Sequence, residues 1–224
     1  MTVRISPELA EILPSFALGV LRYTDVTVSP SPKMLQGRIN LFVESLRLEH
    51  ELSRINEIEG VTQWRSGFKR LGIDPSRYRP SSEALLRRLL QGNPFFWINS
   101  AVDVNNFLSV LHALPYGIYD EAKLEGDVVC RLGQASDVYE GLNGRDVHME
   151  GKLVLADELG AFGSPIVDSK RTPVEEGSTS LMQVIFFHEQ LTPEQQQEIL
   201  GSTARMFTEI NGGEVRSSII VTAR

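Results

Sequence analysis

Two adjacent amides inside an apolar segment are the first side chains in this sequence with an evident chemical use. Asn105 and Asn106 lie in residues 98–112, where apolar residues recur with the spacing of one helical face. Asparagine is a poor helix former, because its side chain competes for backbone hydrogen bonds. Two of them in an apolar helix indicate that something other than helix propensity selects them.

A second polar segment, residues 161–172, is dense in glycine, proline, hydroxyl groups and charge. Such a loop can offer backbone amides and hydroxyls to a polar ligand. The alternative is a tight turn in which Asp168 and Ser169 cap neighbouring backbone groups. Its candidate ligand-binding residues are Gly163, Ser164, Asp168 and Ser169.

Signatures of the common catalytic and metal sites are absent from the sequence. It has no Gly-x-Ser-x-Gly motif, no P-loop and no dinucleotide fingerprint. Its four histidines are scattered without the spacing of metal ligands. The single Cys130 excludes an internal disulfide and is interpreted as a small buried residue in a strand. We therefore expect no metal and no cofactor.

Positive charge is concentrated in residues 61–88 of a chain whose net charge is −7. This segment has seven Lys and Arg residues, two acidic residues and three aromatic residues. A basic segment with interleaved aromatics is a candidate phosphate-binding surface on an otherwise acidic protein. The alternative is that these charges form the solvated faces of two amphipathic helices. The residues assigned to RNA binding are Arg65, Lys69, Arg70, Arg77 and Arg79.

Length and composition are those of a globular protein. A chain of 224 residues makes one large domain or two small ones, and 42% hydrophobic with 23% charged residues is ordinary. No apolar run reaches the roughly 18 residues that span a membrane. The first residues lack the apolar core of a signal peptide. We expect a cytoplasmic protein with no membrane partner.

The elements that must position these residues change from helical to extended near Pro115. Ser100 and Asp103 are expected to form a capping box at the start of the asparagine-bearing helix. Asn143-Gly144 predicts a β-hairpin with a two-residue turn. Helices before residue 115 and strands after it indicate an α+β fold. The other expected helices lie within residues 32–58, 63–71, from Ser81 or Ser82 to 90, and 192–211; strands are expected at 17–28, 127–132, 138–142, 145–149, 152–156, 180–187 and 214–223.

The order and spacing of several segments resemble a known enzyme subunit. Residues 99–107, Asn-Ser-Ala-Val-Asp-Val-Asn-Asn-Phe, resemble the N-x-V-D-V-T-N-Y segment of the phenylalanyl-tRNA synthetase β subunit. The spacing from there to Pro115, and on to residues 118–124, is similar to its Q-P-x-H-A-F-D…K-L. Arg131 and residues 142–144 and 153–157 are similar to its V-R-R…L-D-G…L-V-I-A-D run. The resemblance covers roughly residues 90–187.

The resembling module is the B3/4 domain, which in that synthetase forms the site that hydrolyses tyrosine mischarged onto the phenylalanine tRNA. The resemblance implies a B3/4-like module with N-terminal helices and a mixed β-sheet packed with helices. It further implies a single free-standing domain over residues 1–224, with a helical N-terminal part (1–90) and a sheet-rich core (90–224) that carries the pocket.

Carried over by position, the resemblance assigns a pocket wall to the two asparagines. Asn106 matches the family's pocket asparagine, and Asn105 replaces a threonine. The family's editing histidine falls on Gly117, and a pocket glutamate falls near Gln183 or Val184. The family's G-V-M-G-G loop becomes residues 163–167. The resemblance thus implies a retained pocket whose polar groups have changed.

Three hypotheses follow for function. The first is a free-standing editing factor that binds tRNA through the basic residues and places an aminoacyl ester between Asn106 and residues 163–172 for attack by water. The second is non-catalytic binding of tRNA, aminoacyl-tRNA or an amino-acid-like small molecule. The third is an unrelated hydrolase with Asp168, Ser169 and Lys170 as its polar centre.

Overall fold

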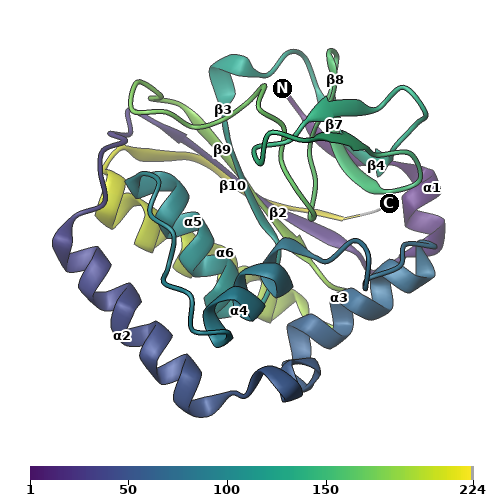
Figure 1. Cartoon of the computed structure of the whole chain (residues 1–224). Coiled ribbons are helices and arrows are strands. Elements are labelled where there is room, and N and C mark those ends of the chain that lie inside the picture. The colour runs from purple at the N-terminus through teal and green to yellow at the C-terminus, as the bar shows by residue number, and fades with distance from the viewer. Residues whose placement is uncertain (223–224) are drawn as a thin grey trace.

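The computed structural model describes residues 1–222 (Figure 1). After a strand, a helix and a second strand, helices fill residues 33–112, strands dominate residues 116–187, and a helix and a strand follow. The N-terminal part contains a strand and a helix that the sequence patterns missed, β1 and α1. The helices are α1 (Pro7–Ile12), α2 (Lys33–Glu49), α3 (Glu59–Arg70), α4 (Ser81–Leu90), α5 (Ser100–His112) and α6 (Pro193–Asn211), with short 3₁₀ helices η1 (Leu52–Glu57) and η2 (Glu121–Lys123). The strands are β1 (Val3–Ile5), β2 (Ala17–Thr24), β3 (Tyr116–Asp120), β4 (Val128–Leu132), β5 (Val138–Glu140), β6 (Asp146–His148), β7 (Leu153–Asp157), β8 (Gly160–Gly163), β9 (Leu181–Phe187) and β10 (Glu214–Thr222).

The main sheet has the order β10-β2-β9-β3, with every neighbouring pair antiparallel. Strand β9 lies within the predicted strand 180–187, and all seven of its residues are buried. A strand reads as continuously apolar when both faces of its sheet are covered. Helices α5 and α6 pack together against one face (Figure 1). Strand β3 forms one edge of this sheet.

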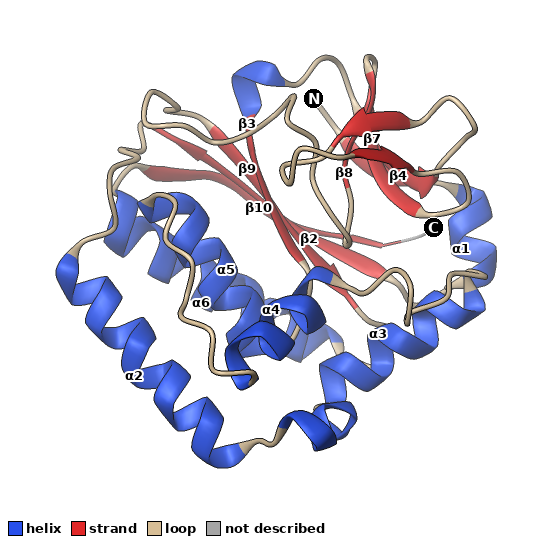
Figure 2. Cartoon of the chain, viewed as in Figure 1, coloured by secondary structure: helices blue, strands red, loops and turns tan. Residues whose placement is uncertain are grey.

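The second sheet has the order β1-β4-β7-β8 and lies on the side of the main sheet away from α5 and α6 (Figure 2). Its β1 and β4 are parallel, and the other pairs are antiparallel. The Tyr119 ring of β3 meets the Phe162 ring of β8 edge to face, with centroids 4.9 Å apart. Strands from the first 24 residues therefore belong to both sheets, and the predicted α+β class is confirmed.

The predicted hairpin is present as β5 and β6, with Gly144 at φ 77° in its loop. Glu140 pairs with Asp146, so the connection has five residues rather than the two that Asn143-Gly144 predicts. Helix α6 lies within the predicted range 192–211. It begins with a full capping box at Thr192 and Gln195, which the sequence patterns did not identify, and it has a proline in its first turn.

Two predicted helix caps are wrong. Helix α5 is capped by the Asn99 side chain, which accepts a hydrogen bond from Val102 N at 2.9 Å. Ser100 Oγ bonds to Asn211 Oδ1 of α6 instead, because the helix start is buried against a second helix. Helix α4 starts after Pro80, with no side-chain cap. None of the helices in residues 1–222 is long and apolar enough to cross a membrane.

Candidate functional site

A cavity of about 610 Å³ lies between α4, α5, the edge strand β3 and the loop that follows β8. Its volume is in the range of sites for small organic ligands. Most of its lining is apolar, with side chains such as Val102, Ile118 and Val174. Its polar lining comes from both segments singled out in the sequence, because Asn105 and Asn106 of α5 face Ser164 and Asp168 of the loop across it; Ser81, Arg88 and Tyr116 also line it.

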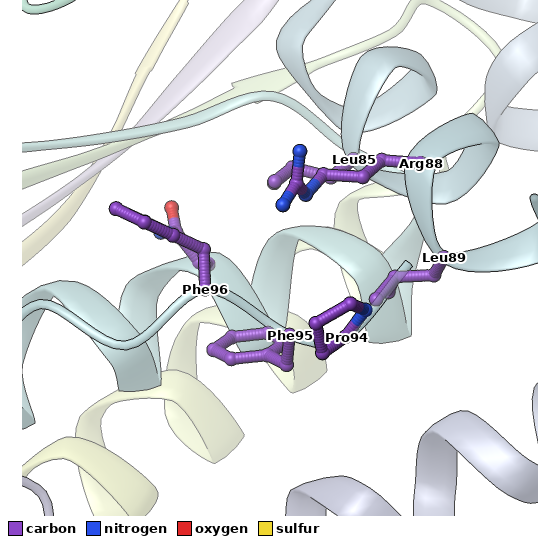
Figure 3. Close-up of a pocket in the computed structure, with 7 residues that line it drawn as sticks. Leu85, Arg88, Leu89, Pro94, Phe95 and Phe96 are labelled. Atoms are coloured by element: carbon purple, nitrogen blue, oxygen red, sulfur yellow. The ribbon is translucent and has the colours of Figure 1, made fainter. Parts of the chain in front are cut away.

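A second hollow of about 350 Å³ adjoins this cavity and shares Leu85, Arg88, Phe96 and Asn106 with it. In Figure 3 the Arg88 side chain extends from α4 toward the side where the Phe96 ring lies. Phe96 is 64% exposed although it is aromatic. The cavity therefore opens to solvent through a rim that carries one aromatic ring and one guanidinium.

Asn105 is buried, and both the oxygen and the nitrogen of its amide are hydrogen-bonded within the fold. Its Oδ1 accepts a hydrogen bond from Gln183 Nε2 at 3.0 Å, and its Nδ2 donates to the Tyr116 carbonyl at 3.5 Å. The Gln183 Oε1 accepts in turn from the Tyr23 hydroxyl at 2.8 Å. Buried polar groups are satisfied in this way in native proteins. Gln183 lies behind the cavity wall and fixes the orientation of Asn105.

Asn106, the next residue of α5, has the opposite environment. It is half-buried and lines both hollows. Its side chain makes no hydrogen bond to any other part of residues 1–222, whereas that of Asn105 makes two. One asparagine of the pair is therefore structural, and the other presents a free amide donor and acceptor to the cavity.

Asp168 is the carboxylate of the site. Its Oδ1 accepts hydrogen bonds from the Tyr119 hydroxyl at 2.9 Å and from Ser164 N at 3.1 Å. Its Oδ2 has no hydrogen-bond partner within the described chain. Burial raises the pKa of Asp168 to about 7, and the two hydrogen bonds to Oδ1 only partly oppose that increase. Near neutral pH this carboxyl group exists in both protonation states.

Gly117 and Gly163 make room for Tyr119. A Cβ atom at either position would overlap the Tyr119 hydroxyl, which lies between the two glycines. Burial and the neighbouring Asp168 carboxylate raise the pKa of Tyr119, so its hydroxyl keeps its proton and donates a hydrogen bond to Asp168. The position at which the resemblance expects a histidine is thus occupied by the hydroxyl of a tyrosine two residues further along β3.

The hydroxyl groups of the two loop serines bond to backbone groups of the loop itself. Ser164 Oγ donates to the Val167 carbonyl at 2.8 Å and accepts from Val167 N at 2.9 Å. Ser169 is buried outside the cavity lining, and its Oγ accepts from Arg171 N at 3.1 Å. Lys170 pairs with Glu140 on the surface. Neither hydroxyl is positioned as an activated nucleophile.

The predicted RNA-binding residues divide into two groups. Arg65 pairs with the fully buried Glu83 at 2.9 Å, and Arg70 pairs with Glu189. Lys69 is exposed and has no acidic partner within residues 1–222, and Arg77 lies over the Tyr78 ring. Arg79 is 4.0 Å from Glu83, at the limit of an ion pair.

Sequence reasoning missed the roles of Tyr119, Phe96 and Arg88 in this site. Arg88 belongs to the basic segment, yet it lines the cavity and pairs with no acid in the part of the chain that the structure describes. Ser81, Ala84, Leu85 and Arg88 fall on one face of α4, and that spacing is the signal that could have separated Arg88 from its neighbours.

Other candidate groups lie elsewhere. Cys130 is buried, and burial raises its pKa, which leaves the thiol unreactive. Burial lowers the pKa of His112 to about 4. Among residues 1–222, no cluster of three or more His, Cys, Asp or Glu side chains could hold a metal ion.

Comparison with known proteins places this site in a family. The model of the B3/4 domain matches residues 63–212, which include both walls of the cavity. The chain belongs to the B3/4 domain family. The uncharacterized protein YhzB of Bacillus subtilis is 26% identical over 213 residues, which are 95% of this chain and 96% of that protein.

Other similar proteins are much longer than this B3/4 chain. The phenylalanine–tRNA ligase beta subunit of Corynebacterium glutamicum is 26% identical over 170 residues, which are 71% of this chain and 19% of that subunit. A solved N-terminal fragment of the phenylalanyl-tRNA synthetase beta subunit from Pyrococcus horikoshii aligns with 98% of this chain and 53% of its own length, at 12% identity and a TM-score of 0.48.

Proposed function

We propose that this B3/4 protein binds the aminoacyl end of a tRNA in the cavity and hydrolyses its ester bond. The observation that carries the proposal is the meeting of the free Asn106 amide and the Asp168 loop across one open cavity. The similarity to phenylalanine–tRNA ligase beta subunits supports an aminoacyl-tRNA as the ligand, with an amino acid of the phenylalanine or tyrosine type. A tRNA ligand would place the protein in the cytoplasm.

The proposed reaction is direct attack by water on the ester carbonyl. The water oxygen bonds to the carbonyl carbon, the ester C–O bond breaks, and the terminal ribose hydroxyl leaves with a proton from the water. Asn106 Nδ2 donates a hydrogen bond to the oxygen on which negative charge develops. A covalent intermediate is not part of the proposal, because the Ser164 hydroxyl is held by the turn and Cys130 is buried elsewhere.

We assign the phosphate contacts to cations that have no acidic partner closer than 4.0 Å within residues 1–222. Arg88 stands at the cavity rim, and Lys69, Arg77 and Arg79 lie on α3 or on the segment that leads into α4. Arg65 and Arg70, which the sequence grouped with them, hold α3 against Glu83 and Glu189. Contacts to phosphates make RNA affinity fall steeply as salt rises.

A second candidate is binding without turnover. The feature that favours it is the Tyr119 hydroxyl, which occupies the space of a side chain at position 117 and leaves the cavity without an imidazole. Such a protein would hold an aminoacyl-tRNA and protect or deliver it.

The test is deacylation of tRNA charged with phenylalanine and of phenylalanine tRNA mischarged with tyrosine, each with and without the protein. We expect faster loss of the ester with the protein, and a rate at least about tenfold lower in Asn106→Leu. Asn56→Leu is the matched control, because Asn56 is an exposed asparagine on η1 outside the cavity lining.

The outcomes separate the two candidates. Salt-sensitive binding of charged tRNA without faster deacylation would select the binding module. Neither binding nor deacylation with any charged tRNA would overturn both.

A further inference from the structure

The described lining of the cavity has one carboxylate and one guanidinium group. Asp168 is the only carboxylate among the described residues that line it, and Arg88 is the only cation. The two come from opposite walls, Arg88 from α4 at the rim and Asp168 from the loop after β8. No ion pair joins either of them to another described residue.

Asp168 lacks what the other enclosed carboxylates have, a cation or a hydrogen-bond donor on each oxygen. Asp103 is fully buried without an ion pair, but Ser31 Oγ donates to its Oδ2 and Ile98 N donates to its Oδ1. Glu83 is paired with Arg65 and Arg87, Asp137 with Arg131, and Asp157 with Arg171. The charge of Asp168 is met only by the neutral donors Tyr119 and Ser164, both on Oδ1. An enclosed carboxylate without a cation is costly, so a ligand that brings a cation to Oδ2 gains the interaction that the fold leaves unmade.

We propose that Asp168 binds the α-ammonium group of the aminoacyl ligand and thereby selects esters with a free amino group over N-acylated ones. This proposal rests on the proposed function, because it names the group of the aminoacyl end that the loop recognises. An aminoacyl-RNA end has one cation, its ammonium, and an anionic phosphate nearby, which matches an acid inside the cavity and Arg88 at its rim. The apolar lining remains for the amino-acid side chain.

The surroundings of Asp168 let a cation set its protonation state. The titratable or charged groups that face it are Tyr119 of β3, Tyr139 of β5 and, across the cavity, Arg88 of α4. Because burial raises the pKa of Asp168 to about 7, an ammonium ion at Oδ2 favours the ionised form and lowers that pKa. Binding of an ammonium ligand should therefore release protons from the protein below pH 7.

The experiment measures affinity by calorimetry for stable amide analogues, the 3′-aminoacylamino-3′-deoxyadenosines of phenylalanine, tyrosine, leucine and alanine, and for their N-acetyl derivatives. We expect the free amines to bind at least about tenfold more tightly than the N-acetyl forms, the usual range for a hydrogen bond to a charged group. Asp168→Asn should remove that difference by weakening the free amines alone. Glu140→Gln is the control, because Glu140 is an exposed carboxylate outside the cavity lining.

The comparison of free and acetylated amines on the unmodified protein needs no variant, so it holds even if Asp168→Asn folds poorly. Equal affinity for both forms would overturn the ammonium assignment and leave the proposed function standing. Binding by none of the analogues would overturn both. Phenylalaninamide without the nucleoside is a further arm: affinity equal to that of the nucleoside analogue would retain the ammonium assignment and overturn the RNA-linked function.

Discussion

Charged side chains are paired with each other where α3 meets α4, and among the described residues they are unpaired in the cavity beside α4. Glu83 of α4 is fully buried and pairs with Arg65 at 2.9 Å and with Arg87 at 2.7 Å. In the cavity, Asp168 and Arg88 have no such partners in the part of the chain that the structure describes. The difference teaches that the basic segment is not one surface: its paired arginines join elements of the fold, and its unpaired cations are free for a ligand.

The largest expected effect is a loss of stability when the ion pairs of Glu83 are broken. Glu83→Gln should lower the free energy of unfolding by about 3 kcal/mol, because it leaves Arg65 and Arg87 without the buried charge that they enclose. Urea denaturation measures the change. Glu140→Gln, which breaks an exposed ion pair with Lys170, should cost less than about 1 kcal/mol. Equal losses in the two variants would remove the distinction between paired and surface charge.

Asp168→Asn should raise the free energy of unfolding, whereas Glu83→Gln lowers it. Because the folded pKa is raised to about 7 and the unfolded value is about 4, protonated Asp168 stabilises the fold below pH 4, and that contribution is lost as the pH rises through 7. The variant should therefore be more stable than the unmodified protein at pH 8, by about 1–3 kcal/mol, and the gain should vanish near pH 4. Thermal unfolding at both pH values measures this, and a gain that is independent of pH would contradict it.

Arg88→Gln and Arg65→Gln should separate binding from stability. Arg88→Gln should weaken tRNA binding about fivefold and reduce the slope of log affinity against log salt by about one, with little change in stability. Arg65→Gln should lower stability and leave the salt slope unchanged, because its guanidinium is committed to Glu83. Filter binding over a salt series decides, and an equal loss of slope in both variants would restore the single basic surface that the sequence suggests.

The smallest effect concerns the hydroxyl beneath Asp168. Tyr119→Phe removes one of the two hydrogen bonds that hold Oδ1, so the pKa of Asp168 should rise further, by less than about one unit. Binding of an amine analogue should then gain strength at a correspondingly higher pH. Calorimetric titrations from pH 5.5 to 8 measure the shift, and an unchanged or lowered midpoint would show that the hydroxyl does not stabilise the carboxylate.

Local patterns predicted much of the fold because their causes are local. The apolar spacing of α5, the start of α6 near Thr192 and the hairpin at Asn143-Gly144 each depend on residues a few positions apart. The Ser100 cap was wrong because Asn211, more than a hundred residues away, takes its hydroxyl. The order of the sheets depends in the same way on pairings such as β2 with β9, which sequence spacing does not encode.

The candidate site shows the same division. Residue types and the family resemblance singled out Asn106 and Asp168, and the fold places both on the cavity. Their binding roles stay predictions. The different environments of Asn105 and Asn106 follow from the rotation of α5 and the position of Gln183. Two adjacent asparagines in a sequence do not show which of them faces the core. Arg65 and Arg88 are equally basic in the sequence and differ only by where Glu83 lies.

The placement of the Tyr119 hydroxyl between Gly117 and Gly163 makes positions 117 and 119 thermodynamically coupled. A histidine at position 117 would collide with that hydroxyl, so Gly117→His alone should destabilise the protein, and a smaller residue at position 119 alone should leave a void beside Asp168. Combined in one chain, each change relieves the fault of the other, so the two free-energy costs should not add. The histidine-bearing arrangement is therefore two coupled substitutions away from this chain and not one.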